Sequence, residues 1–148
     1  MNYVERLEHW GDEHHPKWVD LIRIALGVFL FTKGIEFANN TSTVSALLAE
    51  EAPFSSFIIV ILAHYLIFAH IAGGFLLVVG LLTRLACIIQ IPVVLGAIIF
   101  VNWEVMKPFS MFLLSLMILL LLIYFMVIGS GPWSLDRALF GKNDEDVR

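Results

Sequence analysis

Histidines and charged side chains inside long apolar runs are the residues of this chain best placed for chemistry. A charge at bilayer depth is costly and usually faces a bundle interior or a water-filled cavity. The candidates for an interior polar or binding site are His70, His64, Arg23, Lys33, Glu36 and Gln90. A neutral imidazole can hydrogen-bond a ligand, relay a proton or ligate a metal, so His70 is the centre of this hypothesis. The alternative is a structural histidine that hydrogen-bonds a neighbouring helix, since such bonds are ordinary in membranes.

Four apolar runs must position these side chains. They cover roughly residues 18–38, 54–82, 85–103 and 109–128. Each is close to or longer than the ~20 residues that an α-helix needs to cross ~30 Å of hydrocarbon. The chain is therefore predicted to be an all-α membrane protein, a four-transmembrane-helix bundle with a short cytoplasmic C-terminal helix. Residues 1–17 form a polar segment, 18–140 the membrane domain and 141–148 a charged tail.

Counting along these helices places the polar residues in two layers. Arg23, Arg84 and Gln90 fall in an inner, cytoplasmic layer. Lys33, Glu36 and His64 fall in an outer layer, with Asn102 and Glu104 at its rim and His70 nearer the middle. Lys33 and Glu36 are one helical turn apart and can pair with each other.

Composition supports the membrane assignment and limits other functions. Hydrophobic residues make up 59% of the 148 residues and charged residues 15%, which leaves no room for a soluble catalytic domain. The net charge of −4 and the lack of a basic stripe argue against nucleic acid as a partner. The lipid bilayer is the predicted partner. Other membrane subunits or further copies of the chain fit the small-residue helix faces equally well.

Positive charges predict the topology, because Lys and Arg near span ends are retained on the cytoplasmic side. Arg6 and Lys17 precede the first run, Arg84 lies between the second and third, and Arg137, Lys142 and Arg148 follow the fourth. Residues 39–53 contain no Lys or Arg and are interpreted as a polar loop on the opposite side. Both termini are therefore predicted to be cytoplasmic.

Glycine and proline mark how the helices pack. Gly27 and Gly34 share a face of the first helix, and Gly73, Gly74 and Gly80 give the second a small-residue surface. Pro53 and Pro108 suit the first turns of the second and fourth helices, and Pro92 should kink the third. The fourth helix is nearly all Leu, Ile, Met and Phe, so it is expected to be the most lipid-exposed.

Several cofactor classes find little support in the residues. The single cysteine, Cys87, cannot form an intramolecular disulfide and is interpreted as a packing residue. Haem is disfavoured because His64 and His70, six residues apart, do not project together. Metal-ligand residue types occur in the amino-terminal segment, at His9, Asp12, Glu13, His14 and His15. They lack a defined spacing, so no metal site is predicted.

The carboxyl-terminal part has its own pattern. Residues 129–132 should end the fourth helix, and Ser134 is a suitable N-cap for a short surface helix with Asp136 in its first turn. Asp136 should emerge at the level of Arg23 and Arg84. We predict that it forms a structural ion pair with one of them and holds this tail beneath the bundle.

An ordered set of short motifs resembles the DoxX family of small bacterial membrane proteins. The motifs are RIALG at 23–27, KG at 33–34, HIAGG at 70–74, GLLTR at 80–84 and GPWSLD at 131–136. The resemblance covers roughly residues 21–139 and implies a four-helix, multi-pass protein of the bacterial cytoplasmic (inner) membrane. Many DoxX-like sequences have a glutamate where His70 stands and a basic residue near Phe37, so a carboxylate is replaced here by an imidazole.

The resemblance also suggests a function. The family is associated with a thiosulfate:quinone oxidoreductase, and some members are linked to membrane redox or oxidative-stress complexes. It implies an accessory or assembly subunit of a membrane redox or respiratory complex, without catalytic activity of its own. The alternative is a quinone-linked oxidoreductase component or small-molecule transporter with an interior polar pocket. The residues themselves indicate no cofactor, and the resemblance suggests a quinone as the one candidate.

Overall fold

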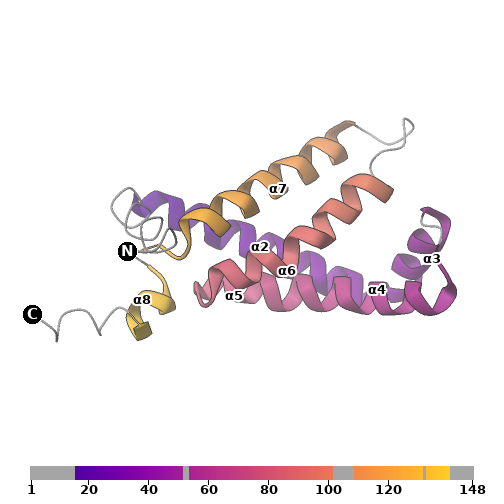
Figure 1. Ribbon diagram of the computed structural model, residues 1–148, viewed down its shortest axis with the longest axis horizontal. Coiled ribbons are helices and arrows are strands. Elements are labelled where there is room, and N and C mark those ends of the chain that lie inside the picture. Colours follow the sequence, from indigo (N-terminus) through magenta and orange to yellow (C-terminus); the bar gives the residue numbers. More distant parts are fainter. Residues whose placement is uncertain (1–15, 52–53, 102–108, 132, 141–148) are drawn as a thin grey trace, which may run out of the picture.

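The computed structural model describes residues 16–51, 54–101, 109–131 and 133–140, and over these ranges the chain is helical with no strand (Figure 1). The helices in chain order are α2 (Lys17–Asn39), α3 (Thr41–Glu51), α4 (Ser56–Phe68), the π-helix η1 (Ala69–Gly73), α5 (Gly74–Val79), α6 (Thr83–Gly96), the π-helix η2 (Ala97–Val101), α7 (Phe109–Ile128) and α8 (Leu135–Phe140). The predicted all-α class is confirmed.

Three helices in the described part are long and apolar enough to cross a membrane. They are Ser56–Val79, in which α4, η1 and α5 are continuous, Thr83–Phe100, which joins α6 to η2, and Phe109–Ile128, which is α7. They coincide with the second, third and fourth predicted runs. Of the three, α7 has the smallest buried share, 17%, which agrees with the prediction that it is the most lipid-exposed.

The first predicted run corresponds to α2, a helix of 23 residues. At ~1.5 Å per residue it is long enough to cross the hydrocarbon, but it is more polar than the other three. Its charged residues are Lys17, Asp20, Arg23, Lys33 and Glu36. Its role as a fourth span stays a prediction.

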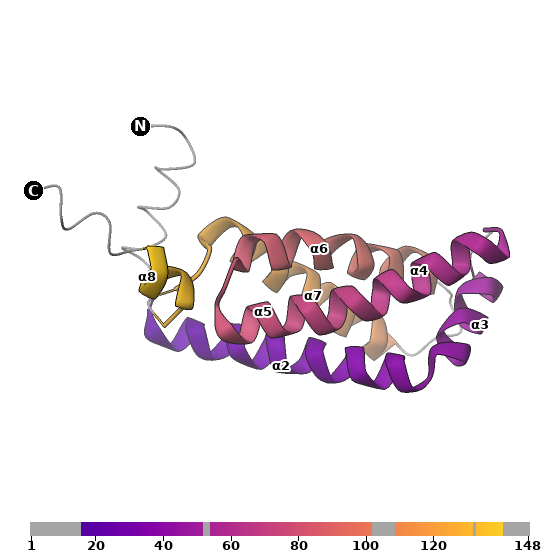
Figure 2. The ribbon, with the colours of Figure 1, turned by 90° about the horizontal axis from the view of Figure 1, so that it is seen from below.

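Small residues let α2 lie close against η1 and α5, as the glycine pattern predicts. A Cβ atom built on Gly74 would lie 2.5 Å from the backbone nitrogen of Phe31, and one on Gly34 would lie 2.8 Å from that of Ile71. In both places the neighbouring atom is backbone, so a side chain could not simply turn away. Figure 2 shows α2 running alongside the α4–α5 helix over most of its length.

The interpretation of residues 39–53 as a polar loop is wrong, because Thr41–Glu51 forms helix α3. Asn40 ends α2 with its side-chain amide donating to the carbonyl of Glu36 at 2.9 Å, and the chain then turns directly into α3. Val44 and Leu48, one turn apart, lie buried and half-buried against the bundle. Ser42 and Thr43 lie on the exposed side of α3, whereas Thr41 and Ser45 are half-buried. Pro53, Pro108, Asn102 and Glu104 lie outside the described residues.

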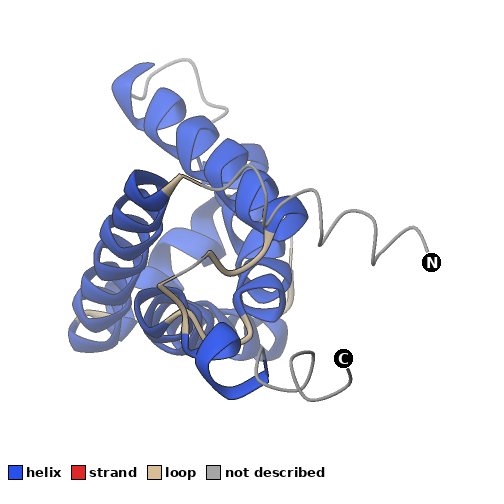
Figure 3. Cartoon of the chain, turned by 90° about the vertical axis from the view of Figure 1, so that its left-hand side faces the viewer, coloured by secondary structure: helices blue, strands red, loops and turns tan. Residues whose placement is uncertain are grey.

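The core lies where α2, α5, α6 and α7 meet. Its members include Leu30, Leu77, Leu122 and Phe125, each at most 1% exposed. Seen along the bundle in Figure 3, the helices surround this centre, with α7 packed against α6 and η2. Pro92 lies inside α6, as predicted. The start of α2, the turn from α5 to α6, the end of α7 and α8 all gather at one end, and α3 lies at the other (Figure 1).

Candidate functional site

A buried ion pair joins Asp20 and Arg23 on one face of α2. The two side chains are 0% exposed, and Nη1 of Arg23 lies 3.1 Å from Oδ1 of Asp20. Their i,i+3 spacing brings them together on a single helix turn. Charges taken out of solvent need further hydrogen bonds to offset the loss of hydration, and both residues have them.

The partners of this pair come from two distant parts of the chain. Arg23 donates from Nε to the carbonyl of Leu77 at 3.1 Å and from Nη2 to the carbonyl of Trp133 at 3.0 Å. Asp20 accepts from the backbone N–H of Trp133 through Oδ2 at 2.9 Å. One ion pair therefore connects α2 to the end of α5 and to the segment that follows α7. This is an architectural role, and it leaves Arg23 outside the interior cavity described below.

The turn from α5 to α6 is shaped to receive the same segment. Gly80 and Leu82 have positive φ values of 71° and 47°. Asp136 accepts from the backbone N–H of Leu82 through Oδ1 at 2.9 Å and from Oγ of Ser130 through Oδ2 at 2.8 Å. Its own N–H donates to the carbonyl of Gly80 at 3.2 Å. Asp136 thus attaches the tail to the bundle, as predicted, but through backbone and serine contacts.

Of the two arginines predicted as partners of Asp136, Arg23 requires correction, because the carboxylate that forms its ion pair is that of Asp20. Asp20 precedes Arg23 by three residues on the same helix and is already in place when the helix forms. Arg84 donates to the carbonyl of Val127 at 3.4 Å, near the end of α7. Its pairing with Asp136 stays a prediction. Ser134 directly precedes α8, at the predicted cap position.

A partly open cavity of about 410 Å³ lies toward the α3 end of the bundle, lined by residues of α2, α3, α4, η1, α6, η2 and α7. Its size falls within the range of ~300–1,000 Å³ typical of small-molecule sites. The walls are mostly aliphatic and aromatic, and three polar residues reach them: Lys33, His70 and Ser115. A few polar groups in an apolar cavity is the usual composition of a ligand site.

His70 is the buried titratable residue of this cavity, at 8% exposed. Its Nδ1 lies 2.9 Å from the carbonyl of Leu66, and its ring contacts the ring of Phe37 edge-on at 5.3 Å. A carbonyl can only accept, so Nδ1 carries the proton in this arrangement. In the neutral ring Nε2 is then a hydrogen-bond acceptor. It suits a ligand hydroxyl, and only the protonated ring could donate to a ligand carbonyl.

Lys33 and Glu36 form the pair that their spacing allows, with Nζ 2.7 Å from Oε2. Their side chains are 39% and 56% exposed, so this ion pair is exposed, whereas the Asp20–Arg23 pair is buried. Lys33 also lines the cavity, whereas Glu36 does not appear in its walls. Of these two residues, Lys33 is therefore the one that can contact a cavity ligand.

The prediction that His64 lines the interior requires correction. His64 is exposed, on the face of α4 that also carries Tyr65 and Phe68, while Ala63 on the other face is fully buried. Its Nδ1 lies 2.8 Å from the carbonyl of Val60. The six-residue separation puts His64 and His70 on different faces of the helix, as their spacing predicts.

Gln90 is fully buried but lies apart from the cavity. Neither its Nε2 nor its Oε1 has a hydrogen-bond partner among the described residues, and the same holds for Oγ1 of Thr83. The side chain packs on Gly73, where a Cβ atom would lie 2.9 Å from Cγ of Gln90. The predicted inner layer is thus divided: Arg23 holds the carboxyl-terminal segment, Arg84 contacts the end of α7, and Gln90 packs against η1.

No group of three or more His, Cys, Asp or Glu side chains that could hold a metal occurs within the described ranges, and the amino-terminal histidines lie outside them. Cys87 is buried in the core, where it was expected to pack. Sequence reasoning missed Asp20, which the i,i+3 spacing to Arg23 could have indicated. It also missed Ser115 as a wall residue of the cavity, although a polar residue within an apolar run is a sequence signal for an interior position.

Comparison with known proteins identifies the family. The sequence model of the DoxX family matches residues 19–103, which is more than half of the chain and includes Asp20, Arg23 and His70. Searches of the curated proteins and of the solved structures found no match. Together with three helices able to span a membrane, this match shows that the chain is a membrane protein belonging to the DoxX family.

Proposed function

We propose that this DoxX protein is an accessory subunit of a membrane redox or respiratory complex, and that it holds a quinol-class molecule in the cavity beside His70. The observation that carries the proposal is the cavity itself: about 410 Å³, largely apolar, with a buried histidine in its wall. Electron transfer belongs to the partner enzyme, and the chain described here has no catalytic activity of its own.

The hydrogen-bonding state of His70 favours the reduced form of such a ligand. Nδ1 is engaged by the carbonyl of Leu66 at 2.9 Å, which leaves Nε2 as an acceptor for a phenolic hydroxyl. The oxidised form presents carbonyl oxygens, to which Nε2 of the neutral ring has no proton to donate. A fixed tautomer of this kind would orient the hydroxyl as well as bind it.

The same proposal includes the topology. We treat α2 as the fourth span, which gives a bundle with both termini on the cytoplasmic side of the bacterial inner membrane. The contact between Asp20 in the first turn of α2 and Trp133 before α8 supports the placement of both ends on one side. The positive charges near these ends support the cytoplasmic assignment.

The first experiment is binding of duroquinol, a quinol without a chain, to the protein in lipid nanodiscs. His70→Ala should weaken binding about tenfold, since a buried hydrogen bond is worth about 1–1.5 kcal/mol. His64→Ala is the matched control, because His64 makes the same bond to the carbonyl four residues before it but is exposed. Equal effects of the two substitutions, or a wild-type protein that binds neither duroquinol nor a quinol with a hydrocarbon chain, would refute the quinol as the ligand.

A second candidate is an assembly subunit that binds no small molecule. It is favoured by the Asp20–Arg23 pair, whose hydrogen bonds all serve the architecture. Native mass spectrometry of the protein extracted gently from its own membrane separates the two. A larger complex that carries quinol mass supports the first candidate, and a larger complex without small-molecule mass supports the second.

A further inference from the structure

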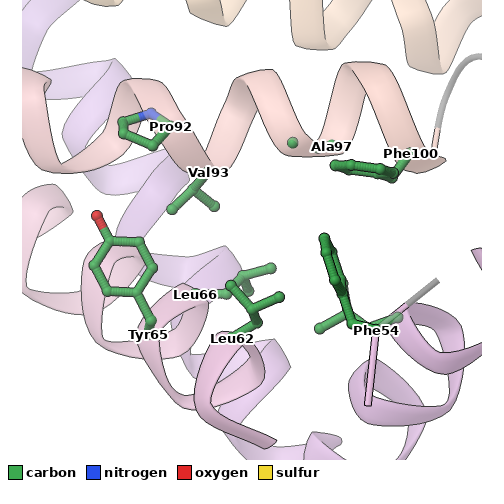
Figure 4. A pocket seen from close by; sticks show the side chains of 10 residues that line it. Phe54, Leu62, Tyr65, Leu66, Pro92, Val93, Ala97 and Phe100 are labelled. Atoms are coloured by element: carbon green, nitrogen blue, oxygen red, sulfur yellow. The ribbon is translucent and has the colours of Figure 1, made fainter. Parts of the chain in front are cut away.

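A second cavity, of about 260 Å³, lies between α4 on one side and α6 with η2 on the other (Figure 4). In Figure 4 the side chains of Leu62, Leu66 and Tyr65 lie opposite Pro92, Val93 and Ala97. The rings of Phe54 and Phe100 meet edge-on at one end, with centroids 5.8 Å apart. We call this space the tail chamber.

The tail chamber offers an almost purely apolar surface. Its one wall residue with a polar side-chain atom is Tyr65, and the Tyr65 hydroxyl already donates to the carbonyl of Ile89 at 3.0 Å. The aromatic ring therefore faces the chamber as a flat apolar wall, while its polar end is satisfied by α6. Such a space suits hydrocarbon and lacks the convergent polar groups that would fix a head group.

Gly96 lines this chamber at a position where a side chain would meet open space. A Cβ atom built on Gly96 would have no atom within 4 Å, although Gly96 lines the chamber. At Gly27, Gly34 and Gly74, by contrast, the same construction meets backbone at 2.8 Å or less. Those glycines permit close helix packing, whereas a Cβ atom on Gly96 would have no close neighbour. A glycine inside a helix costs about 0.5–1 kcal/mol relative to alanine, so its presence here points to the space it leaves.

The tail chamber adjoins the His70 cavity. Leu48, Leu66, Val93 and Ala97 line both, so the two spaces share a wall. The His70 cavity has polar groups in its walls, whereas the one polar group in the wall of the tail chamber, the Tyr65 hydroxyl, is already hydrogen-bonded. An amphipathic molecule needs such a pair of neighbouring spaces, one partly polar and one apolar.

We infer that the tail chamber holds the hydrocarbon chain of the molecule whose head group lies beside His70. This inference rests on the proposed function and narrows it, because it selects quinols that carry a chain over those that do not. Gly96 is then the residue that determines chain specificity.

The test compares two ligands, duroquinol without a chain and decylubiquinol with one, in nanodiscs of fixed lipid composition. Gly96→Leu should lower the affinity for decylubiquinol at least tenfold and leave the affinity for duroquinol unchanged. The leucine side chain fills the tail chamber but not the His70 cavity. His70→Ala should weaken both. Ile99→Phe adds bulk to the exposed face of the same segment, outside both cavities, and should affect neither. Gly96→Ala should give a smaller loss in the same direction, which keeps the test available if the leucine variant does not fold.

Each result decides something. If Gly96→Leu leaves the affinity for decylubiquinol unchanged, or lowers the affinity for both quinols equally, the assignment of the tail chamber to the hydrocarbon chain is wrong and the His70 site stands. If decylubiquinol binding depends on Gly96 but not on His70, the proposed head-group site is wrong and the tail chamber stands. If the wild-type protein binds neither quinol, both are wrong.

Discussion

Loss of Arg23 should destabilise the bundle more than any other single charge removal in the described part of the chain. The Arg23→Met variant keeps a long apolar side chain but leaves Asp20 0% exposed without its counter-ion. Breaking a buried ion pair from one side costs about 3–5 kcal/mol, because the remaining charge is uncompensated. The variant also leaves the carbonyls of Leu77 and Trp133 without their donor.

Loss of Asp20 should cost less, and the structure says why. In Asp20→Asn the amide oxygen can still accept from the N–H of Trp133, and Arg23 keeps its two carbonyl acceptors. A charged hydrogen-bonding contact is worth about 1.5–3 kcal/mol, so we expect a loss of about 2 kcal/mol. The double variant removes both charges, and it should be at least about 2 kcal/mol more stable than the sum of the single effects predicts.

The assay is reversible unfolding of the purified protein in mixed micelles, followed by circular dichroism as the denaturing detergent fraction rises. Lys33→Met is the matched control, because Lys33 and Glu36 have the same i,i+3 spacing on the same helix but are 39% and 56% exposed. An exposed pair is worth about 0–1 kcal/mol. The reasoning is refuted if Arg23→Met costs no more than Lys33→Met, or if the effects of Asp20→Asn and Arg23→Met simply add.

Four further substitutions test the packing by the same unfolding measurement. Gly74→Ala should cost about 1–3 kcal/mol by overpacking, since its Cβ would lie 2.5 Å from the backbone of Phe31, whereas Gly96→Ala should be neutral or stabilising; equal effects would contradict the packing argument. Gln90→Leu should raise the free energy of unfolding by about 1 kcal/mol, because the buried amide has no partner among the described residues, and a loss would reveal a bound water. Gly80→Ala should cost at least about 1–2 kcal/mol, because φ is +71° and the Cβ would lie 2.8 Å from Nη2 of Arg23; an unchanged midpoint would argue against this turn.

The spans could be predicted from sequence because bilayer thickness sets a length that apolar runs must meet. Helix α3 could not be predicted in this way, because serine and threonine do not by themselves distinguish a loop from a half-buried helix. What makes it a helix is tertiary, since Val44 and Leu48 complete the walls of the His70 cavity. Local composition carries no record of that contact.

The candidate site was predictable in part for the same reason. His70 could be placed in the interior because it shares a helix face with Gly73 and Gly74, and such a small-residue face is expected to pack against the bundle. The sequence analysis named Arg23 and Arg84 as possible partners of Asp136 and did not consider Asp20, whose local i,i+3 spacing to Arg23 forms the ion pair. The cavity could not be predicted, because its walls come from seven separate segments. The state of Nε2 depends on which contact the ring makes within its own helix, here Nδ1 to the carbonyl of Leu66, and the sequence does not specify that contact.

The π-helical segment η1 has a consequence for how this site can be inherited. A π turn accommodates one residue more than an α turn, and η1 contains both His70 and Gly73, directly before Gly74. Loss of a single codon within η1 would rotate the helix beyond it by about 100° relative to the part before it. His70 could then face the cavity, or Gly74 could face α2, but the two could not do so together. The histidine site and the glycine seam therefore depend on one inserted residue, and descendants that lose it must give up one of the two.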